Sequence, residues 1–224
     1  VLKLALTSGL AMFGFSWPQE TKANTSGLHL GGWETPLQNG IAQAATFDFF
    51  QQWYCDQIGL KGPMNVLNTQ ISILDTGYTP GRLLTAYGNI IQGGDYSNSG
   101  NQNDGYGHGT NACSILATSG AEVISRKIFN DQGQVYTLEM INKAIIDSIG
   151  SDILVLNFSS NTPELKELTS AIKAAADNGV ILICPAGNGS RPSPDAPASL
   201  AYRIPTLISV SSVYKEGKIS GFTN

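Results

Sequence analysis

The chain is poor in basic residues. Its 224 residues hold 13 Lys and Arg against 17 Asp and Glu, which gives a formal net charge of −4 and a pI near 5.1. There is thus no basic excess to bind the phosphates of nucleic acid, and no long block of like charge forms a tail. We therefore expect no nucleic-acid partner.

Cysteine is scarce as well, with only Cys55, Cys113 and Cys184 in the whole chain. Three thiols cannot all pair with one another. Cys113 and Cys184 lie inside apolar stretches, where a thiol behaves as a small hydrophobic group. The sequence therefore predicts buried, unreactive thiols at these two positions rather than a fold held by disulfides.

No apolar run reaches the 18 or more residues that a membrane-spanning helix needs. The mostly apolar residues 4–17 follow Lys3 and precede Thr21-Lys22-Ala23, where small residues suit cleavage by signal peptidase. We predict residues 1–23 to be a signal peptide, which makes the protein secreted or extracytoplasmic, with no stable membrane span. A packed N-terminal helix is the alternative for this segment.

Length and composition fit one domain. With 42% hydrophobic residues and no internal repeat, the chain can bury one sizeable core, which we place in residues 51–224. Residues 24–50 are rich in Gly, Thr, Asn and Gln and form a predicted N-terminal extension. Its histidine, His29, has no acidic or thiol neighbour at metal-ligand spacing, so we predict an ordinary surface residue.

From residue 69 onward, short β-like runs alternate with amphipathic helical segments, which is typical of a parallel α/β sheet. The predicted strands are 71–74, 122–129, 153–158, 180–184 and 206–213, and the predicted helices are 108–118, 137–149 and a segment between Thr162-Pro163 and Asn178-Gly179. We predict an α/β fold with a mainly parallel sheet of at least five strands and helices on both faces.

Polar residues follow three of these strands. They are Asp75, the segment 157–160 and the segment 185–188. In parallel α/β sheets, ligands and catalytic groups collect at the carboxyl ends of the strands. We therefore expect these segments to form one site together with the start of the helix at His108.

Six motifs follow one another along the chain. They are Gln52-Trp53 with Ile58-Gly59; Ile73 to Gly77; Asp104 to Thr110; Leu156 to Ser159; Pro185 to Asn188; and Ser209 to Val213 followed by Ile219 to Asn224. In this order they resemble the motifs of the subtilisin-type serine peptidases, the subtilase family. The resemblance covers about residues 51–224 and implies a serine endopeptidase with the subtilisin-like fold.

The resemblance implies roles for three residues. His108 would be the general base that takes the proton from a serine hydroxyl, and Asp75 would orient its ring and stabilise the imidazolium. Asn188 would donate its side-chain amide to the developing oxyanion; the alternative is a turn residue between glycines. Gly107 and Gly109 suit close backbone approach around His108.

The resemblance also implies how substrate and ions would bind. A protein or peptide would bind as an extended strand between Phe158-Ser159-Ser160 and a second segment near Gln134, although Phe158 also fits simple core packing. Asn161 stands where the family usually has glycine, and its side chain would narrow the substrate site.

Ion binding is not expected. The link 118–121 is too short for the tight calcium site of secreted subtilisins, so we expect no cofactor. Four further acidic residues of the domain are too scattered in the sequence to predict another ion site. They are Asp95, Asp104, Asp131 and Asp195.

The nucleophile is the largest gap in the resemblance. The family's Gly-Thr-Ser motif occurs nowhere in the chain, and we expect the domain to be incomplete at its C-terminus with the serine beyond residue 224. One alternative is a catalytically inactive relative that binds peptide strands. Another is an aspartic peptidase, suggested by Asp75-Thr76-Gly77 alone. Such an enzyme needs a second motif of this kind or a dimer, usually has Ser or Thr where this chain has Tyr78, and is built on β-rich lobes instead of an α/β alternation.

Overall fold

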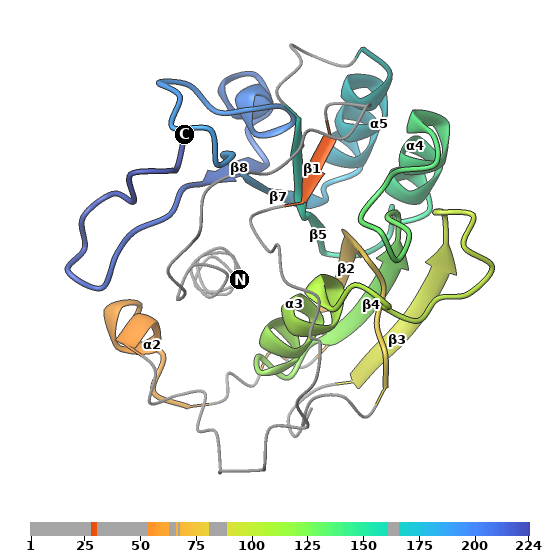
Figure 1. Ribbon diagram of the computed structural model, residues 1–224, viewed down its shortest axis with the longest axis horizontal. Helices are drawn as coiled ribbons and strands as arrows, with labels where there is room; N and C mark the ends of the chain where they lie inside the picture. Colours follow the sequence, from red (N-terminus) through yellow and green to blue (C-terminus); the bar gives the residue numbers. More distant parts are fainter. Residues whose placement is uncertain (1–27, 31–52, 63–65, 67, 81–88, 161–165) are drawn as a thin grey trace.

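Figure 1 shows the computed structural model of the chain, with a twisted sheet between helices. The structure describes residues 28–30, 53–62, 66, 68–80, 89–160 and 166–224. The predicted signal peptide, most of the predicted extension and Asn161 lie outside the described residues.

The main sheet has six strands in the order β3-β4-β2-β5-β7-β8, and each neighbouring pair is parallel. The strands are β2 (Gln70–Asp75), β3 (Asn89–Asp95), β4 (Glu122–Lys127), β5 (Ile153–Leu156), β7 (Ile181–Pro185) and β8 (Leu207–Val210). The predicted α/β fold with a mainly parallel sheet is thus confirmed, and β3 is a strand that the sequence did not predict.

Helices cover both faces of this sheet, as predicted. They are α3 (His108–Ala117), α4 (Leu138–Ile146) and α5 (Lys166–Asp177), beside the shorter α2 (Trp53–Gln57) and the 3₁₀ helix η3 (Ala198–Tyr202). Successive strand residues point to opposite faces. Ile71 and Ile73 of β2 therefore pack in the core that holds α3, whereas Leu74 packs in the core that holds α4 and α5. In Figure 1 these helices lie on opposite sides of the central strands.

The predicted strand 153–158 is two elements in the structure. β5 ends at Leu156, and after Asn157 the chain forms β6 (Phe158–Ser160), which leaves the main sheet. β6 pairs antiparallel with β1 (Leu28–Leu30), with Leu30 opposite Phe158 and Leu28 opposite Ser160. A segment of the predicted N-terminal extension, including the backbone of His29, is therefore placed against β6.

The predicted helix 137–149 is shorter and covers Leu138–Ile146. Thr137 is its N-cap, whose hydroxyl accepts from the Met140 N–H at 3.2 Å, and Asp147 is its C-cap. The predicted strand 206–213 likewise ends at Val210, since the chain then turns. These are errors of boundary and leave the order of elements unchanged.

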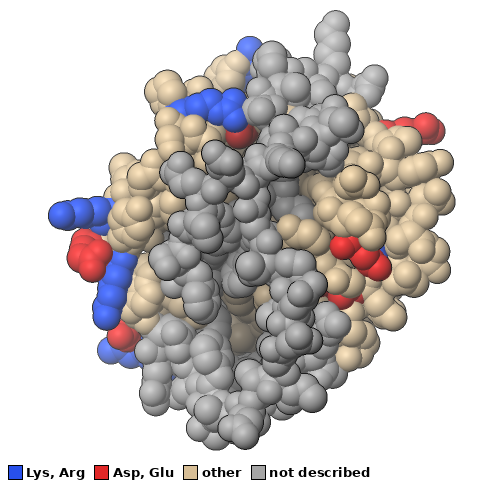
Figure 2. Space-filling view, in the orientation of Figure 1, with Lys and Arg blue, Asp and Glu red and all other residues tan. Residues whose placement is uncertain are grey.

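All three cysteines are buried and none of them forms a disulfide, as predicted for Cys113 and Cys184. Burial raises the pKa of both of these thiols well above its usual range, which keeps them protonated and unreactive. None of the described helices is both long and apolar enough to cross a membrane. Figure 2 shows Lys and Arg side chains at separate places on one face, several of them beside acidic groups.

Candidate active site

Asp75 and His108 meet where β2 ends and α3 begins. His108 Nδ1 lies 2.6 Å from Asp75 Oδ1, and both side chains are buried. With a proton on Nδ1 the imidazole donates to the carboxylate, which leaves Nε2 as the basic nitrogen. The two residues that the sequence singled out are thus in direct contact, in the arrangement of an orienting acid and a general base.

Two further donors hold the Asp75 carboxylate. The Thr76 N–H donates to Oδ1 at 2.6 Å, and Asn157 Nδ2 donates to Oδ2 at 2.6 Å. Asn157 is fully buried at the end of β5, next to β2 in the sheet. The sequence predicts Asn157 at this edge of the sheet but not its contact with Asp75, for which the adjacency of the two strand ends was the available signal.

The close approach of α3 to β2 requires glycine at position 109. A β-carbon there would overlap the Gly77 carbonyl oxygen and would lie 3.2 Å from the Asp75 β-carbon. Gly107, directly before the helix, has a φ of 102°, which side-chain-bearing residues rarely adopt. The glycines on either side of His108 therefore bring its ring to the carboxylate.

We expect Gly109→Ala to destabilise the fold by about 2 kcal/mol, because the added methyl group must push α3 away from β2. Urea denaturation followed by circular dichroism measures this change. Gly62→Ala is a matched control, since nothing lies within 4 Å of its β-carbon position. Equal stability of the two variants would contradict the close approach.

A buried carboxylate organises the loop that leads into His108. Asp104 is 1% exposed, and its Oδ1 accepts from Thr76 Oγ1 at 2.8 Å, Gly107 N at 2.7 Å and Tyr106 N at 3.1 Å. Its Oδ2 accepts from Thr110 N and Thr110 Oγ1, each at 2.7 Å. Gly107 supplies no side-chain cap to α3. Asp104 instead accepts from the Thr110 N–H, and Thr76 Oγ1 accepts from the Gly109 N–H at 2.8 Å, so two N–H groups at the start of the helix are satisfied.

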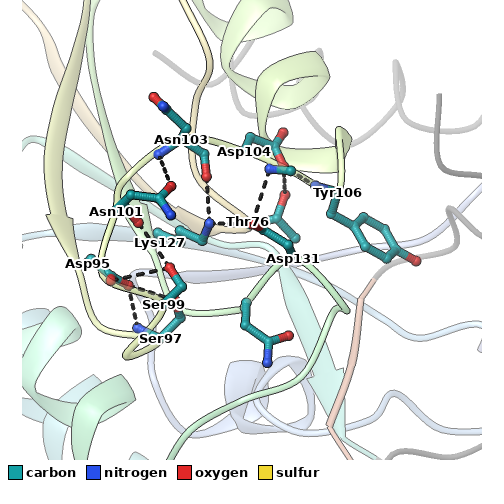
Figure 3. Close-up of polar contacts among 12 residues, drawn as sticks. Thr76, Asp95, Ser97, Ser99, Asn101, Asn103, Asp104, Tyr106, Lys127 and Asp131 are labelled. Atoms are coloured by element: carbon teal, nitrogen blue, oxygen red, sulfur yellow. Dashed lines mark hydrogen bonds and ion pairs between the residues drawn. The ribbon is translucent and has the colours of Figure 1, made fainter. Parts of the chain in front are cut away.

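Lys127 adds a second buried charge beside this loop. Its ammonium group donates to Asp131 Oδ1 at 2.6 Å and to the Asn103 carbonyl at 2.5 Å, while its side chain is fully buried. Asp131 also accepts from the Gly105 N–H at 3.2 Å. Lys127 therefore ties the end of β4 to the His108 loop (Figure 3). Among the described residues, no three His, Cys, Asp or Glu are placed to hold a metal ion.

The predicted substrate-binding residues lie at two places. Phe158, Ser159 and Ser160 are all buried in β6, and the Phe158 ring packs edge-on against Phe129 at 6.4 Å between centroids. Gln134 is exposed in a turn where its backbone N–H donates to Asn130 Oδ1 at 2.9 Å. The packing of Phe158 is that of a core residue, and its role toward substrate stays a prediction.

Asn188 is exposed in the loop that follows β7. Since β7 lies next to β5, and β5 next to β2, the segments of Asn188, Asn157 and Asp75 follow three neighbouring strands. The same loop is joined to β6: Asp195 N donates to the Ala186 carbonyl at 2.7 Å, and Ser160 N donates to the Ala196 carbonyl at 2.7 Å. The sheet topology therefore places the predicted site segments along one edge.

Comparison with known proteins agrees with this geometry. A sequence profile of the subtilase family matches residues 68–224. The chain is 24% identical over 195 residues to the minor extracellular protease Epr of Bacillus subtilis (strain 168), and 28% identical over 189 residues to the major intracellular serine protease of the same organism. These alignments cover 80% and 74% of this chain but 29% and 56% of the two relatives. The chain belongs to the subtilase family.

Proposed function

We propose that this chain supplies the acid, the base and the oxyanion donor of a serine endopeptidase. His108 takes the proton from the serine hydroxyl and later gives it to the leaving amine. Asp75 holds the ring with Nδ1 protonated and stabilises the imidazolium. The observation that carries this proposal is the 2.6 Å contact between two buried side chains at the carboxyl end of the central strand.

Asn188 is the proposed oxyanion donor. Its side chain is exposed at the end of β7, where an amide N–H can face a bound carbonyl oxygen. Such a donor contributes about 3–4 kcal/mol to the transition state.

The nucleophilic serine is proposed to lie in sequence that follows Asn224. The chain spans about a third and about half of the length of the two proteases it resembles, so each of these relatives contains much more sequence than this chain matches. We propose no metal or organic cofactor for the reaction, since a serine, an imidazole and a carboxylate suffice for acyl transfer.

The proposed substrate is a protein or peptide bound as an extended strand on β6. β1 supports this binding mode, because it already pairs with Phe158–Ser160 as an antiparallel strand. β1 runs from the Ser160 end of β6 toward Phe158 and so toward Asn157 and the Asp75 carboxylate that Asn157 contacts. A peptide bound in this direction would present its carboxyl-side residues to His108.

The compartment is proposed from the N-terminal pattern. One relative is named as an extracellular protease and the other as an intracellular one, so membership of the family is compatible with either. The apolar run ahead of Thr21-Lys22-Ala23 favours export.

Labelling with a fluorophosphonate probe tests the proposal, because the probe reacts with a serine activated by a neighbouring base. We expect a protein that continues beyond Asn224 to be labelled, its His108→Ala variant not to be labelled, and the 224-residue chain not to be labelled. Labelling of the 224-residue chain would contradict the position proposed for the serine. An extended protein that folds but stays unlabelled would instead indicate an inactive relative that binds peptide strands.

A further inference from the structure

Asp195 carries a buried carboxylate that has no role in the proposed reaction. It is 7% exposed, and it pairs with Arg191, whose guanidinium nitrogen lies 3.1 Å from Oδ1 and 3.2 Å from Oδ2. The Arg191 side chain is 40% exposed. A carboxylate removed from water in this way needs a cationic partner, because an uncompensated buried charge is strongly destabilising.

The backbone places Asp195 between two parts of the proposed substrate site. Asp195 N donates to the Ala186 carbonyl at 2.7 Å, on the segment that carries Asn188. Ala196 and Ser160 exchange two hydrogen bonds of 3.1 and 2.7 Å, on the edge of β6 away from β1. The Asp195-Ala196 segment therefore joins the oxyanion loop to the strand on which substrate is proposed to bind.

The carboxylate of Asp195 lies against the backbone just before Asn188. A β-carbon on Gly187 would overlap Asp195 Oδ2 as well as the side-chain nitrogen of Asn224. Glycine at this position thus leaves room for the acidic side chain. A negative charge consequently lies one residue from the group proposed to bind the oxygen of the attacked carbonyl.

The distance from a bound peptide to Asp195 favours a long side chain. A peptide in the place of β1 lies on one edge of β6 and Ala196 lies on the other. Neighbouring strands are about 4.8 Å apart, so about 10 Å separates the peptide backbone from the Asp195-Ala196 segment. Among cationic side chains, lysine and arginine have the length and flexibility to cover such a separation.

We infer that Asp195 is a specificity-determining residue that selects a lysine or arginine side chain at the residue whose carbonyl is attacked. This inference rests on the proposed function. Arg191 occupies the carboxylate when no substrate is bound and is displaced by the substrate cation. Because a guanidinium or ammonium group replaces another cation, Asp195 is paired in both states. A neutral side chain cannot make this exchange, and specificity follows from the loss of the charged hydrogen bonds.

Product-like peptides test the inference on the 224-residue chain without any need for catalysis. The probes are N-terminally fluorescein-labelled Ala-Ala-Ala-Arg, Ala-Ala-Ala-citrulline and Ala-Ala-Ala-Leu, and fluorescence anisotropy gives their affinities. Citrulline keeps the shape of arginine without its charge. We expect the arginine peptide to bind about tenfold more tightly than the other two, which corresponds to one charge-assisted contact.

Two variants separate Asp195 from other causes of a charge preference. Asp195→Asn should bind the arginine and citrulline peptides equally. Arg191→Ala should bind the arginine peptide severalfold more tightly than the parent chain does, because no internal cation competes, and should leave citrulline binding unchanged. Asp177→Asn, which removes an exposed charge on α5, is the control and should keep the tenfold ratio.

Three results would overturn the inference. The first is equal binding of the arginine and citrulline peptides to the parent chain. The second is an arginine preference that persists in a folded Asp195→Asn variant; if that variant does not fold, the absence of any gain in Arg191→Ala takes its place. The third is the failure of all three peptides to bind both the parent chain and a chain without residues 1–30, in which β1 no longer covers the edge of β6. That result would contradict the proposed strand-binding mode as well, whereas the first two results contradict the role of Asp195 alone.

Discussion

Asp75→Asn should lower the turnover of an enzyme that includes this chain and its nucleophile by about 10⁴-fold. The asparagine keeps the size of the side chain but can present an N–H to His108, which favours the wrong tautomer of the ring. Asp75 also accepts from Thr76 N and Asn157 Nδ2. The NH₂ group of an asparagine at this position would therefore point at another hydrogen-bond donor instead of an acceptor. Steady-state hydrolysis of a peptide amide measures the loss, which should fall on kcat and leave KM nearly unchanged.

Asp147→Asn is the control for this experiment. Asp147 is also an acidic residue with several partners, since it accepts from Tyr96 and Lys143, but it lies at the end of α4. Its replacement should leave kcat within about twofold of the parent. A loss of activity in Asp75→Asn no larger than in this control would contradict the role of Asp75 as the residue that orients His108.

Asp104→Asn should destabilise the fold by about 3 kcal/mol. The carboxylate accepts five hydrogen bonds in a buried position, and an asparagine side chain offers one oxygen and turns an NH₂ group toward the remaining donors. Because those donors include the start of α3, the position of His108 should also shift. Urea denaturation measures the first effect and kcat of the extended enzyme measures the second.

Asp95→Asn, at the end of β3, is the matched control. Burial alone would raise the pKa of Asp95, but hydrogen bonds from Ser97, Gly100 and Ser99 outweigh it and lower the pKa overall. Its charge therefore contributes stability at a pH above its unfolded pKa, and this contribution is lost as the pH falls through the lowered folded pKa. The control should lose stability at neutral pH and keep kcat, whereas a loss of kcat equal to that of Asp104→Asn would contradict a specific role for Asp104.

Much of the sheet could be predicted from the sequence because its strands are buried on both faces. The run Ile153 to Leu156 is continuously apolar, and Ile71 to Leu74 is apolar except for Ser72; parallel strands covered by helices have this composition. β3 was missed because it lacks this composition. Its residues are mostly half-buried at the sheet edge, and it contains Gly93-Gly94, which weakens any strand signal.

The gathering of site segments could also be predicted, because parallel topology alone brings strand ends to one edge. The contacts within the site could not. Asn157 and Asp104 are separated by 82 and 28 residues from the side chains they hold, Asp75 and Thr76. The pairing of β1 with β6 joins residues still further apart in the chain, and a segment of three residues is too short for a periodicity that indicates its partner.

The contact between His108 Nδ1 and Asp75 Oδ1 is the centre of this account, and proton NMR of the 224-residue chain labelled with ¹⁵N-histidine tests it most directly. The chain has only two histidines, so His29→Gln leaves the signals of His108 alone. A short, buried N–H···O hydrogen bond predicts a far-downfield proton attached to Nδ1 that exchanges slowly with water and is lost in Asp75→Asn. Absence of this proton in the folded parent chain, or its persistence in folded Asp75→Asn, would contradict the assignment of these residues as the acid and base of a subtilase.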